Sequence, residues 1–340
     1  MSETMRPNAA AQLDDVPDEP STLVRIMAWV DRWGALFLVL VMVLLSVVAQ
    51  PEVFLTERNV GNIFRQNSFY AMLALGQFIV IVTAGIDLSV GSTMALAAMT
   101  AAVLADAGTF WPIIFLAPFV VGIAVGTING LGLTKLHMPH PFIMTLGMLF
   151  IVRGITNLIS GGVPISGLPD EVRFLGADNI PGTTIPVSLV AVVVTYFLVW
   201  LFLNHGRQGR HIFAIGGNPQ AARVSGVRVD RTLVLAYALC GLLAGFAGLL
   251  LAGRTNSGFP AAGTGDELYA IAAVIIGGAS FFGGRGTVLG VFAGVLVIGM
   301  LRNLLNLSGI PSFWQQVAIG VVIIGVVAFD VFRRRVAAAA

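Results

Sequence analysis

The chain has 340 residues, of which 57% are hydrophobic and 11% are charged, and its formal net charge is +2. Its mean hydropathy is +0.90. Soluble globular domains are about half apolar and about one quarter charged, and so few charges cannot cover this much apolar surface. The composition therefore excludes a soluble enzyme, a nucleic-acid-binding protein and a disordered chain, and it predicts a polytopic membrane protein.

The first 24 residues are polar and rich in acidic side chains and proline. Such a segment cannot bury enough apolar surface to fold, which predicts a disordered cytoplasmic tail over residues 1–24. It lacks the basic start, followed directly by an apolar core, that marks a cleaved signal peptide. We therefore expect the next apolar segment to be an uncleaved first span.

A transmembrane helix needs about 20 mostly apolar residues, and a window of that length finds ten candidates in this chain. They are residues 34–50, 68–84, 88–106, 111–133, 141–160, 184–203, 232–252, 267–280, 286–305 and 313–332. The second and the eighth are short and end in glycine-containing breaks. We expect hairpins or interrupted helices there.

The basic residues predict the orientation, because cytoplasmic loops carry an excess of lysine and arginine. With the N-terminus inside, thirteen basic residues fall inside and four fall in outside loops. The inside set is Arg6, Arg25, Arg32, Lys135, Arg207, Arg210, Arg223, Arg228, Arg231, Arg285, Arg333, Arg334 and Arg335. The outside set is Arg58, Arg65, Arg173 and Arg254. We expect a single transmembrane domain over 25–335, a short cytoplasmic tail over 336–340, and both termini inside.

Asp87 stands in an otherwise neutral run between two apolar segments. A charged group at bilayer depth is costly unless it is paired or wet, so Asp87, with Ser89 and Ser92, is a candidate for the transport pathway or its gate. In the alternative, Asp87 caps the following helix, with its carboxylate on the amides of Ser89 and Val90. Both hold if the broken helix lines a cavity.

The inside loop over residues 204–231 contains a predicted nine-residue helix, from Asn218 to Gly226. Asn218 suits the N-cap, Pro219 suits the first helical position, and Gly226 suits a left-handed end. A helix of two turns is unstable alone, so it must pack on a partner or on the membrane face. The remaining residues of this candidate coupling loop are Gly217, Ala221, Ala222, Arg223 and Ser225.

A glycine-rich segment follows the eighth window. Its glycines are Gly277, Gly278, Gly283, Gly284 and Gly286. Glycine permits tight reversals and close helix approach, so a helix-packing turn is the favoured interpretation. No predicted strand precedes it, as a nucleotide-binding turn would require.

The sequence predicts no catalytic site, no metal site and no cofactor. The only lysine, Lys135, lies in a Leu-Thr-Lys-Leu run, so the chain has no Gly-Lys-Ser/Thr phosphate-binding loop. If ATP drives this protein, another chain must bind it.

Three segments resemble the permease subunits of bacterial ATP-binding-cassette importers for monosaccharides, the ribose, xylose, arabinose and galactose group. The segment around Asp87 is similar to that family's Gly-Gly-Ile-Asp-Leu-Ser-Val-Gly signature, except that Ala84 stands where the family usually has glycine. Residues 217–227 are similar to its Gly-Asn-x-x-Ala-Ala-x-x-Ser-Gly-Ile loop. Residues 267–274 and the turn after them are similar to its Glu-Leu-x-x-Ile-Ala-Ala motif and Gly-Gly turn. The likeness runs from about residue 60 to 330.

The resemblance implies an all-α permease of the bacterial inner membrane, working as a pair of identical copies. Each copy would bind a cytoplasmic ATP-binding subunit through the helix in 204–231, and a periplasmic sugar-binding protein would dock outside. Glu267 becomes a further candidate pathway residue. Two alternatives remain: an ion-coupled secondary transporter of a small neutral solute, and a passive channel or structural subunit that needs no coupling loop.

Overall fold

The computed structural model describes residues 22–339, with side chains described for 33–322, 324, 325, 328 and 331. These residues form thirteen helices and two short strands. The helices are α1 (Thr22–Ala49), α2 (Glu57–Val82), α3 (Val90–Asp106), α4 (Trp111–Lys135), α5 (Pro141–Ser160), α6 (Asp170–Ala177), α7 (Val187–His205), α8 (Arg207–Gly217), α9 (Pro219–Val224), α10 (Val229–Thr255), α11 (Asp266–Ile276), α12 (Val288–Leu307) and α13 (Ser312–Ala339). The strands β1 (Ile165–Ser166) and β2 (Ser257–Gly258) pair antiparallel.

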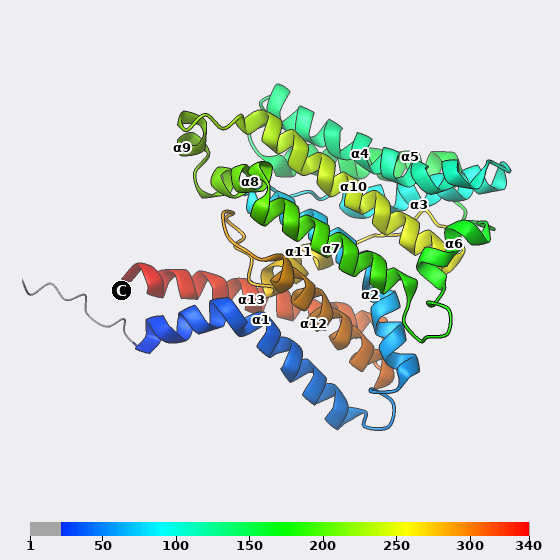
Figure 1. The fold of residues 1–340 in the computed structure, drawn as a ribbon, viewed down its shortest axis with the longest axis horizontal. Helices are drawn as coiled ribbons and strands as arrows, with labels where there is room; N and C mark the ends of the chain where they lie inside the picture. The colour runs from blue at the N-terminus through cyan, green and yellow to red at the C-terminus, as the bar shows by residue number, and fades with distance from the viewer. Residues whose placement is uncertain (1–21, 340) are drawn as a thin grey trace, which may run out of the picture.

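The long helices form one bundle, with α3, α4, α5 and α10 on one side and α1, α12 and α13 on the other (Figure 1). Helices α8 and α9 lie at one end of the bundle and α6 lies at the opposite end. The β1–β2 pair joins two loops far apart in sequence, because Ile165 pairs with Gly258 and Ser166 with Ser257. The loop between α5 and α6 therefore meets the loop between α10 and α11 at one end of the bundle.

Each of the ten apolar windows coincides with one helix. Among the residues with described side chains, five helices are long and apolar enough to cross a membrane: α4, α5, α7, α10 and α12. Helix α3 and residues 33–49 of α1 are shorter apolar helices. The eighth window is an interrupted helix as expected, since α11 has only 11 residues and ends before Gly277.

The helix at the second window is longer than expected, because α2 has 26 residues and begins at Glu57. Its first turns carry polar side chains that a hydropathy window rejects but that find partners in the fold. Asn59 exchanges hydrogen bonds with Asn303 of α12 at 3.1 and 2.8 Å. Arg65 donates to Asn179 at 2.5 Å. Tertiary partners therefore let the helix start 11 residues before the apolar window, at residue 57 and not at residue 68.

The predicted tails differ from the described helices. Residues 1–21 of the expected N-terminal tail lie outside the described residues, and α1 already begins at Thr22. At the other end, α13 continues to Ala339, so most of the expected 336–340 tail is helical. Its run of arginine and alanine favours helix once the last span has nucleated it.

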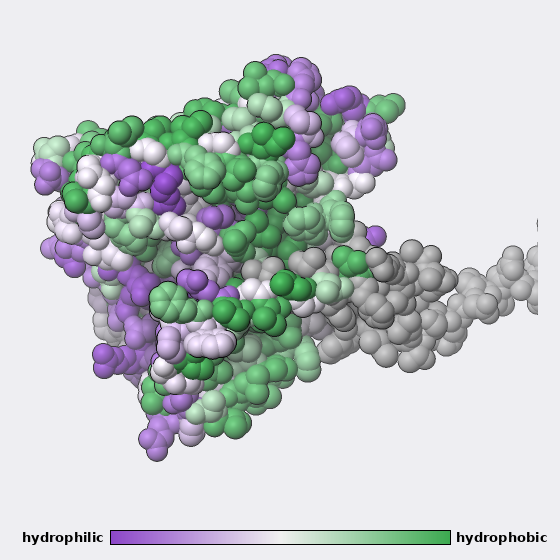
Figure 2. Space-filling model, turned by 180° about the vertical axis from the view of Figure 1, so that it is seen from behind, coloured by the Kyte–Doolittle hydropathy of each residue, from purple (hydrophilic) through white to green (hydrophobic). Residues whose placement is uncertain are grey.

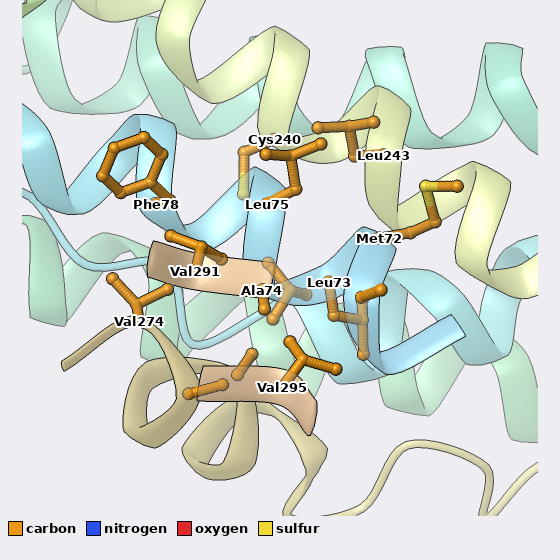
Figure 3. Close-up of a cluster of buried hydrophobic side chains, with 14 of the residues drawn as sticks. Met72, Leu73, Ala74, Leu75, Phe78, Cys240, Leu243, Val274, Val291 and Val295 are labelled. Carbon is orange, nitrogen blue, oxygen red and sulfur yellow. The ribbon is translucent and has the colours of Figure 1, made fainter. Parts of the chain in front are cut away.

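Helix α2 is the centre of the core. From Asn67 to Val82 nearly every side chain is buried, on all sides of the helix. Figure 3 shows its residues Met72, Leu75 and Phe78 among side chains from three other helices. Those partners are Cys240 and Leu243 of α10, Val274 of α11, and Val291 and Val295 of α12. A helix that is apolar all round is expected only where others surround it.

Helices α4 and α10 approach each other closely along a row of glycines. Gly122, Gly126 and Gly130 recur every four residues on α4. A Cβ on Gly122 would overlap the Gly241 carbonyl oxygen, and one on Gly126 would overlap the Tyr237 carbonyl oxygen. Small residues at such spacing permit the close backbone packing that holds membrane helices together.

The surface separates into an apolar belt and two hydrophilic ends. Figure 2 shows hydrophobic residues over the middle of the rear face and hydrophilic residues gathered mainly toward opposite ends. The exposed apolar side chains lie on the span helices, for example Val120 on α4, Phe150 on α5 and Phe197 on α7. Such a belt is the surface that a bilayer requires.

We predict that Gly126→Ala destabilises the fold, because its methyl group would overlap the backbone of α10. Overpacking of this kind costs about 1–3 kcal/mol. The matched control is Gly147→Ala on α5, where a Cβ would meet nothing within 4 Å. There, alanine should be neutral or stabilise by up to about 1 kcal/mol, since it is the better helix former. Thermal unfolding in detergent measures both, and equal shifts would contradict the close α4–α10 contact.

Candidate functional site

The chain leaves α2 at Val82 and enters α3 at Val90 through a short break. Ala84 in this break has φ of 62°, in the left-handed region. That conformation costs an L-residue about 1–2 kcal/mol and costs glycine little. Glycine, the family's usual residue, would therefore fit at position 84 better than Ala84 does.

The break brings Asp87 into the interior, where it is 1% exposed. Its Oδ1 accepts hydrogen bonds from the amide of Ser89 at 2.8 Å and from the Ser89 hydroxyl at 2.6 Å. The side-chain amide of Asn129, on α4, lies 3.3 Å from both carboxylate oxygens and donates to Ser89 Oγ at 2.8 Å. Donors from α4 and from the start of α3 thus compensate the burial of this carboxylate.

Other helices hold the backbone of the same segment. With its amide oriented to match, Gln77 of α2 donates to the Asp87 carbonyl at 3.0 Å and accepts from the Asp87 amide at 3.2 Å. Tyr237 of α10 donates to the carbonyl of Ile86 at 3.2 Å. Side chains from α2, α4 and α10 therefore fix one short stretch of chain.

The capping interpretation of Asp87 holds only in part. Asp87 binds the amide of Ser89, but among the described residues no bond joins it to the amide of Val90. The N-cap residue of α3 is Ser89, whose own side chain makes no capping bond to the helix. Ser92 donates to the Ser89 carbonyl at 2.9 Å, and both serines are fully buried. These three residues form a polar core and do not line an open surface.

Glu267 lies near this core but on another surface. It is half-buried in the first turn of α11, and a Cβ on Gly91 of α3 would meet its carboxylate and the Gly263 carbonyl. Non-helical chain precedes it, and Arg153 of α5 donates to two carbonyls there, of Pro260 at 2.5 Å and Ala262 at 2.6 Å. The arginine thus anchors an irregular segment against α3.

A second cluster near α11 was not predicted as a unit. The guanidinium carbon of Arg302 lies 4.0 Å from the ring centroid of Tyr269 and 4.8 Å from that of Tyr70. Cation–π contacts of this kind stabilise a charge that is partly removed from water. Arg302 was visible in the sequence as a charge at the end of a span, but nothing in the sequence paired it with two tyrosines.

The glycine-rich turn lies against two other segments. Four of its glycines have positive φ: Gly278, Gly283, Gly284 and Gly286. The amide of Gly284 donates to the Val82 carbonyl at the end of α2 at 2.9 Å. A Cβ on Gly283 would lie 2.7 Å from the Ala84 amide nitrogen. A Cβ on Gly216 of α8 would overlap the Val82 carbonyl. The turn, the end of α8 and the break before Asp87 therefore meet backbone to backbone.

The loop over 204–231 contains two helices, whereas the sequence predicted one. Helix α8 was not predicted, because its first turn is charged and its apolar residues are few. The helix nevertheless buries one face, formed by Gly209, Ile212 and Ile215. The predicted nine-residue helix is shorter, since α9 spans only Pro219–Val224. Asn218 caps it as expected, with Oδ1 accepting from the Ala221 amide at 2.9 Å.

The outward face of α9 differs from the expected one. We expected the small residues Ala221 and Ala222 of the candidate coupling loop to let the helix sit close in a partner's cleft, but Ala222 is 5% exposed and packs on Ile215 and Val229 of its own chain. Ala221 is exposed, and Val224 is 87% exposed. Arg223 is exposed and pairs with Asp230 at 3.6 Å. Val224 is therefore the apolar side chain that α9 leaves uncovered.

Comparison with known proteins places this architecture in a family. Residues 59–327 match the family model described as branched-chain amino acid transport system / permease component. The chain is 38% identical over 307 residues to the ribose import permease protein RbsC of Escherichia coli strain K12, covering 89% of this chain and 94% of that protein. It is 39% identical over 305 residues to the D-allose transport system permease protein AlsC of the same strain, covering 88% and 91%.

A third relative is the galactose/methyl galactoside import permease protein MglC of Haemophilus influenzae, 36% identical over 316 residues, covering 88% of this chain and 94% of that protein. The chain belongs to the permease family of bacterial ATP-binding-cassette sugar importers. No solved structure matches it. The permease is thus an inner-membrane transport component and not a catalytic subunit, and ATP hydrolysis belongs to a separate chain.

We predict that Asp87→Leu in this permease lowers the free energy of unfolding more than Asp87→Asn does. Leucine leaves the Ser89 amide and the Ser89 hydroxyl without their acceptor, and each unsatisfied buried group costs about 1–3 kcal/mol. Asn129 loses its contacts with the carboxylate but keeps Ser89 Oγ as an acceptor. Asparagine keeps one acceptor oxygen for Ser89. Detergent unfolding curves measure the difference, and a leucine variant as stable as the native chain would show that these bonds do not hold the break.

Proposed function

We propose that this permease carries a monosaccharide, a pentose, a hexose or a related polyol, into the cytoplasm as the transmembrane subunit of an ATP-driven importer. Relatives at 36–39% identity are named for the import of ribose, galactose and methyl galactoside, and for the transport of allose. These compounds share a small, neutral, polyhydroxylated chemistry. The proposed sugar class rests on that shared chemistry.

The α8–α9 element carries the proposal. It projects from one end of the bundle, in the loop with the densest arginines, and α9 has an apolar side chain without cover. We propose that α9 seats in a cleft of a cytoplasmic ATP-binding subunit, with Val224 and Ala221 toward the partner. A periplasmic sugar-binding protein would dock at the opposite end, near α6 and the β1–β2 pair. Two identical permease copies would complete the importer.

We propose that the ten helices that match the apolar windows are ten membrane spans, with both termini inside. The arginine asymmetry supports this orientation, and so does the position of α6 opposite α9. An ion-coupled secondary transporter more often shows paired acidic groups or Arg/Asp relays within its spans. Asp87 is instead satisfied by neutral donors, which favours the ATP-driven proposal.

We propose that the irregular segment before α11 lines the sugar pathway. Its Gly258 packs against Met99 and its Gly263 against Gly91, so the segment follows α3 through the interior of the bundle. Thr264 nevertheless remains exposed. Non-helical backbone at membrane depth is tolerated only where it is buried in protein or lines a watery cavity. Two carboxylates, Asp266 and Glu267, follow this segment in the first turn of α11. Asp266 is buried and Glu267 is only half-buried, which supports the assignment of Glu267 to the pathway. Asp87, in the buried polar core, would then support the pathway from within the bundle.

The orientation predicts which introduced cysteines are accessible. Thr184→Cys, in the exposed loop before α7, should react with an impermeant thiol reagent from the periplasmic side. Gln220→Cys, exposed on α9, should react only after the membrane is opened. The native Cys240 is fully buried and gives little background. Reversed labelling would overturn the orientation.

The docking proposal predicts that Val224→Asp weakens the ATP-binding subunit's hold on the permease. An unpaired carboxylate in an apolar cleft should reduce affinity by about ten-fold or more. Co-purification and sugar-stimulated ATP hydrolysis measure the loss. Gln208→Asp is the matched control, because it adds the same charge on the exposed face of α8. Normal co-purification and uptake with Val224→Asp, at normal permease level, would instead favour a helix that rests on the lipid surface.

A further inference from the structure

A basic cavity lies beside α9, at the end of the bundle where α4 finishes and α10 begins (Figure 1). Its volume is about 510 Å³. Its lining residues are Lys135, His137, Arg223, Val227, Arg228, Val229, Asp230 and Arg231. The lining contains one lysine and three arginines but only one carboxylate, that of Asp230, which pairs with Arg223 at 3.6 Å. The cavity therefore carries an excess of three positive charges and fits an anion.

The cavity lies where a bilayer would place its headgroups. Lys135 is the last residue of α4 and Val229 is the first residue of α10, and both helices are long and apolar enough to cross a membrane. The hydrocarbon of the bilayer should therefore end close to the floor of the cavity. Basic pockets between membrane helices at this level are suited to anionic lipid headgroups.

An apolar stripe on α4 leads directly to the cavity. Leu131, Ile128 and Val120 precede Lys135 by 4, 7 and 15 residues, so they lie within about 60° of it around the helix. Their exposed fractions are 42%, 49% and 65%. Lys135 is itself exposed at the top of this stripe. One continuous surface thus offers apolar contact along a span and then positive charge at its end.

We propose that this cavity binds the phosphate group of an anionic phospholipid whose acyl chains lie along the exposed stripe of α4. Arginine forks suit phosphate oxygens, and exposed Arg228 and Arg231 stand at the cavity with Lys135. An acidic segment of a protein partner would match the charge but not the apolar stripe that continues below it. The lipid would also contact Arg223, and so would tie α9 to the membrane surface. The binding does not depend on which sugar is transported.

Native mass spectrometry of the full-length permease in detergent tests this assignment. The probes are phosphatidylglycerol, phosphatidylcholine with the same acyl chains, and glycerol phosphate, which has the headgroup chemistry without the chains. Phosphatidylglycerol should bind about ten-fold or more tightly than either of the other two. Because each basic residue near an anionic lipid contributes about five-fold in affinity, Arg228→Gln with Arg231→Gln should reduce its binding by about 25-fold.

The matched control is Arg207→Gln with Arg210→Gln, which removes the same charge from exposed positions on α8, outside the cavity lining. Its affinity for phosphatidylglycerol should stay within about two-fold of the native chain's, because these charges do not face the lipid. Arg228→Lys with Arg231→Lys should retain most of the binding, which guards against loss of fold in the glutamine variant.

Three results would overturn the proposal. Equal binding of phosphatidylglycerol and phosphatidylcholine would exclude selection for an anionic headgroup. Equal binding of glycerol phosphate and phosphatidylglycerol would identify a free-anion site with no role for the stripe. Unchanged lipid binding in the Arg228 and Arg231 double variant, together with loss of the ATP-binding subunit, would identify the cavity as a protein-docking surface.

Discussion

The buried carboxylate of Asp87 is the constraint on which much of this permease depends. A carboxylate inside a membrane bundle must receive hydrogen bonds, and these come from Ser89 and Asn129. Asn129 reaches it because it stands on α4 between Gly126 and Gly130, which let α4 approach α10 backbone to backbone. The glycine row and the polar core therefore depend on each other. Close packing of α4 brings the Asn129 donor to Asp87, and the hydrogen bonds offset the cost of burying the carboxylate at the break between α2 and α3.

The same break also lies next to the α8–α9 element. Gly216 at the end of α8 packs on the Val82 carbonyl, and the Gly283–Gly284 turn packs on Val82 and Ala84. Only a few residues of chain then separate Ala84 from Asp87. Contacts between backbones connect the end of α8 to the break that holds the buried polar core. If the ATP-binding subunit docks on α9, as we propose, these contacts lie between the docking helix and that core.

The irregular segment before α11 and the basic cavity at the end of α4 have different proposed roles. The segment before α11 is irregular within the bundle, where Arg153 donates to two of its carbonyls, and we propose that it lines the sugar pathway. We assign the basic cavity at the end of α4 to the headgroup level of the bilayer, because the exposed apolar stripe of α4 ends there. Depth in the membrane distinguishes them, because polar groups are costly in the hydrocarbon and favourable where the headgroups begin.

The sequence by itself determined the class of protein, the places of the apolar helices, the cap at Asn218 and the isolation of Asp87 between two apolar segments, because hydropathy, helix capping and an isolated charge are local properties. It also identified Ala84 as an unusual residue, and the backbone there is left-handed. Only the tertiary structure decided that Ala222 faces inward, that α2 begins at Glu57, and that Gln77, Asn129 and Tyr237 converge on one break. These features depend on partners far away in the sequence, and no local pattern reveals which helices will be close enough to supply them.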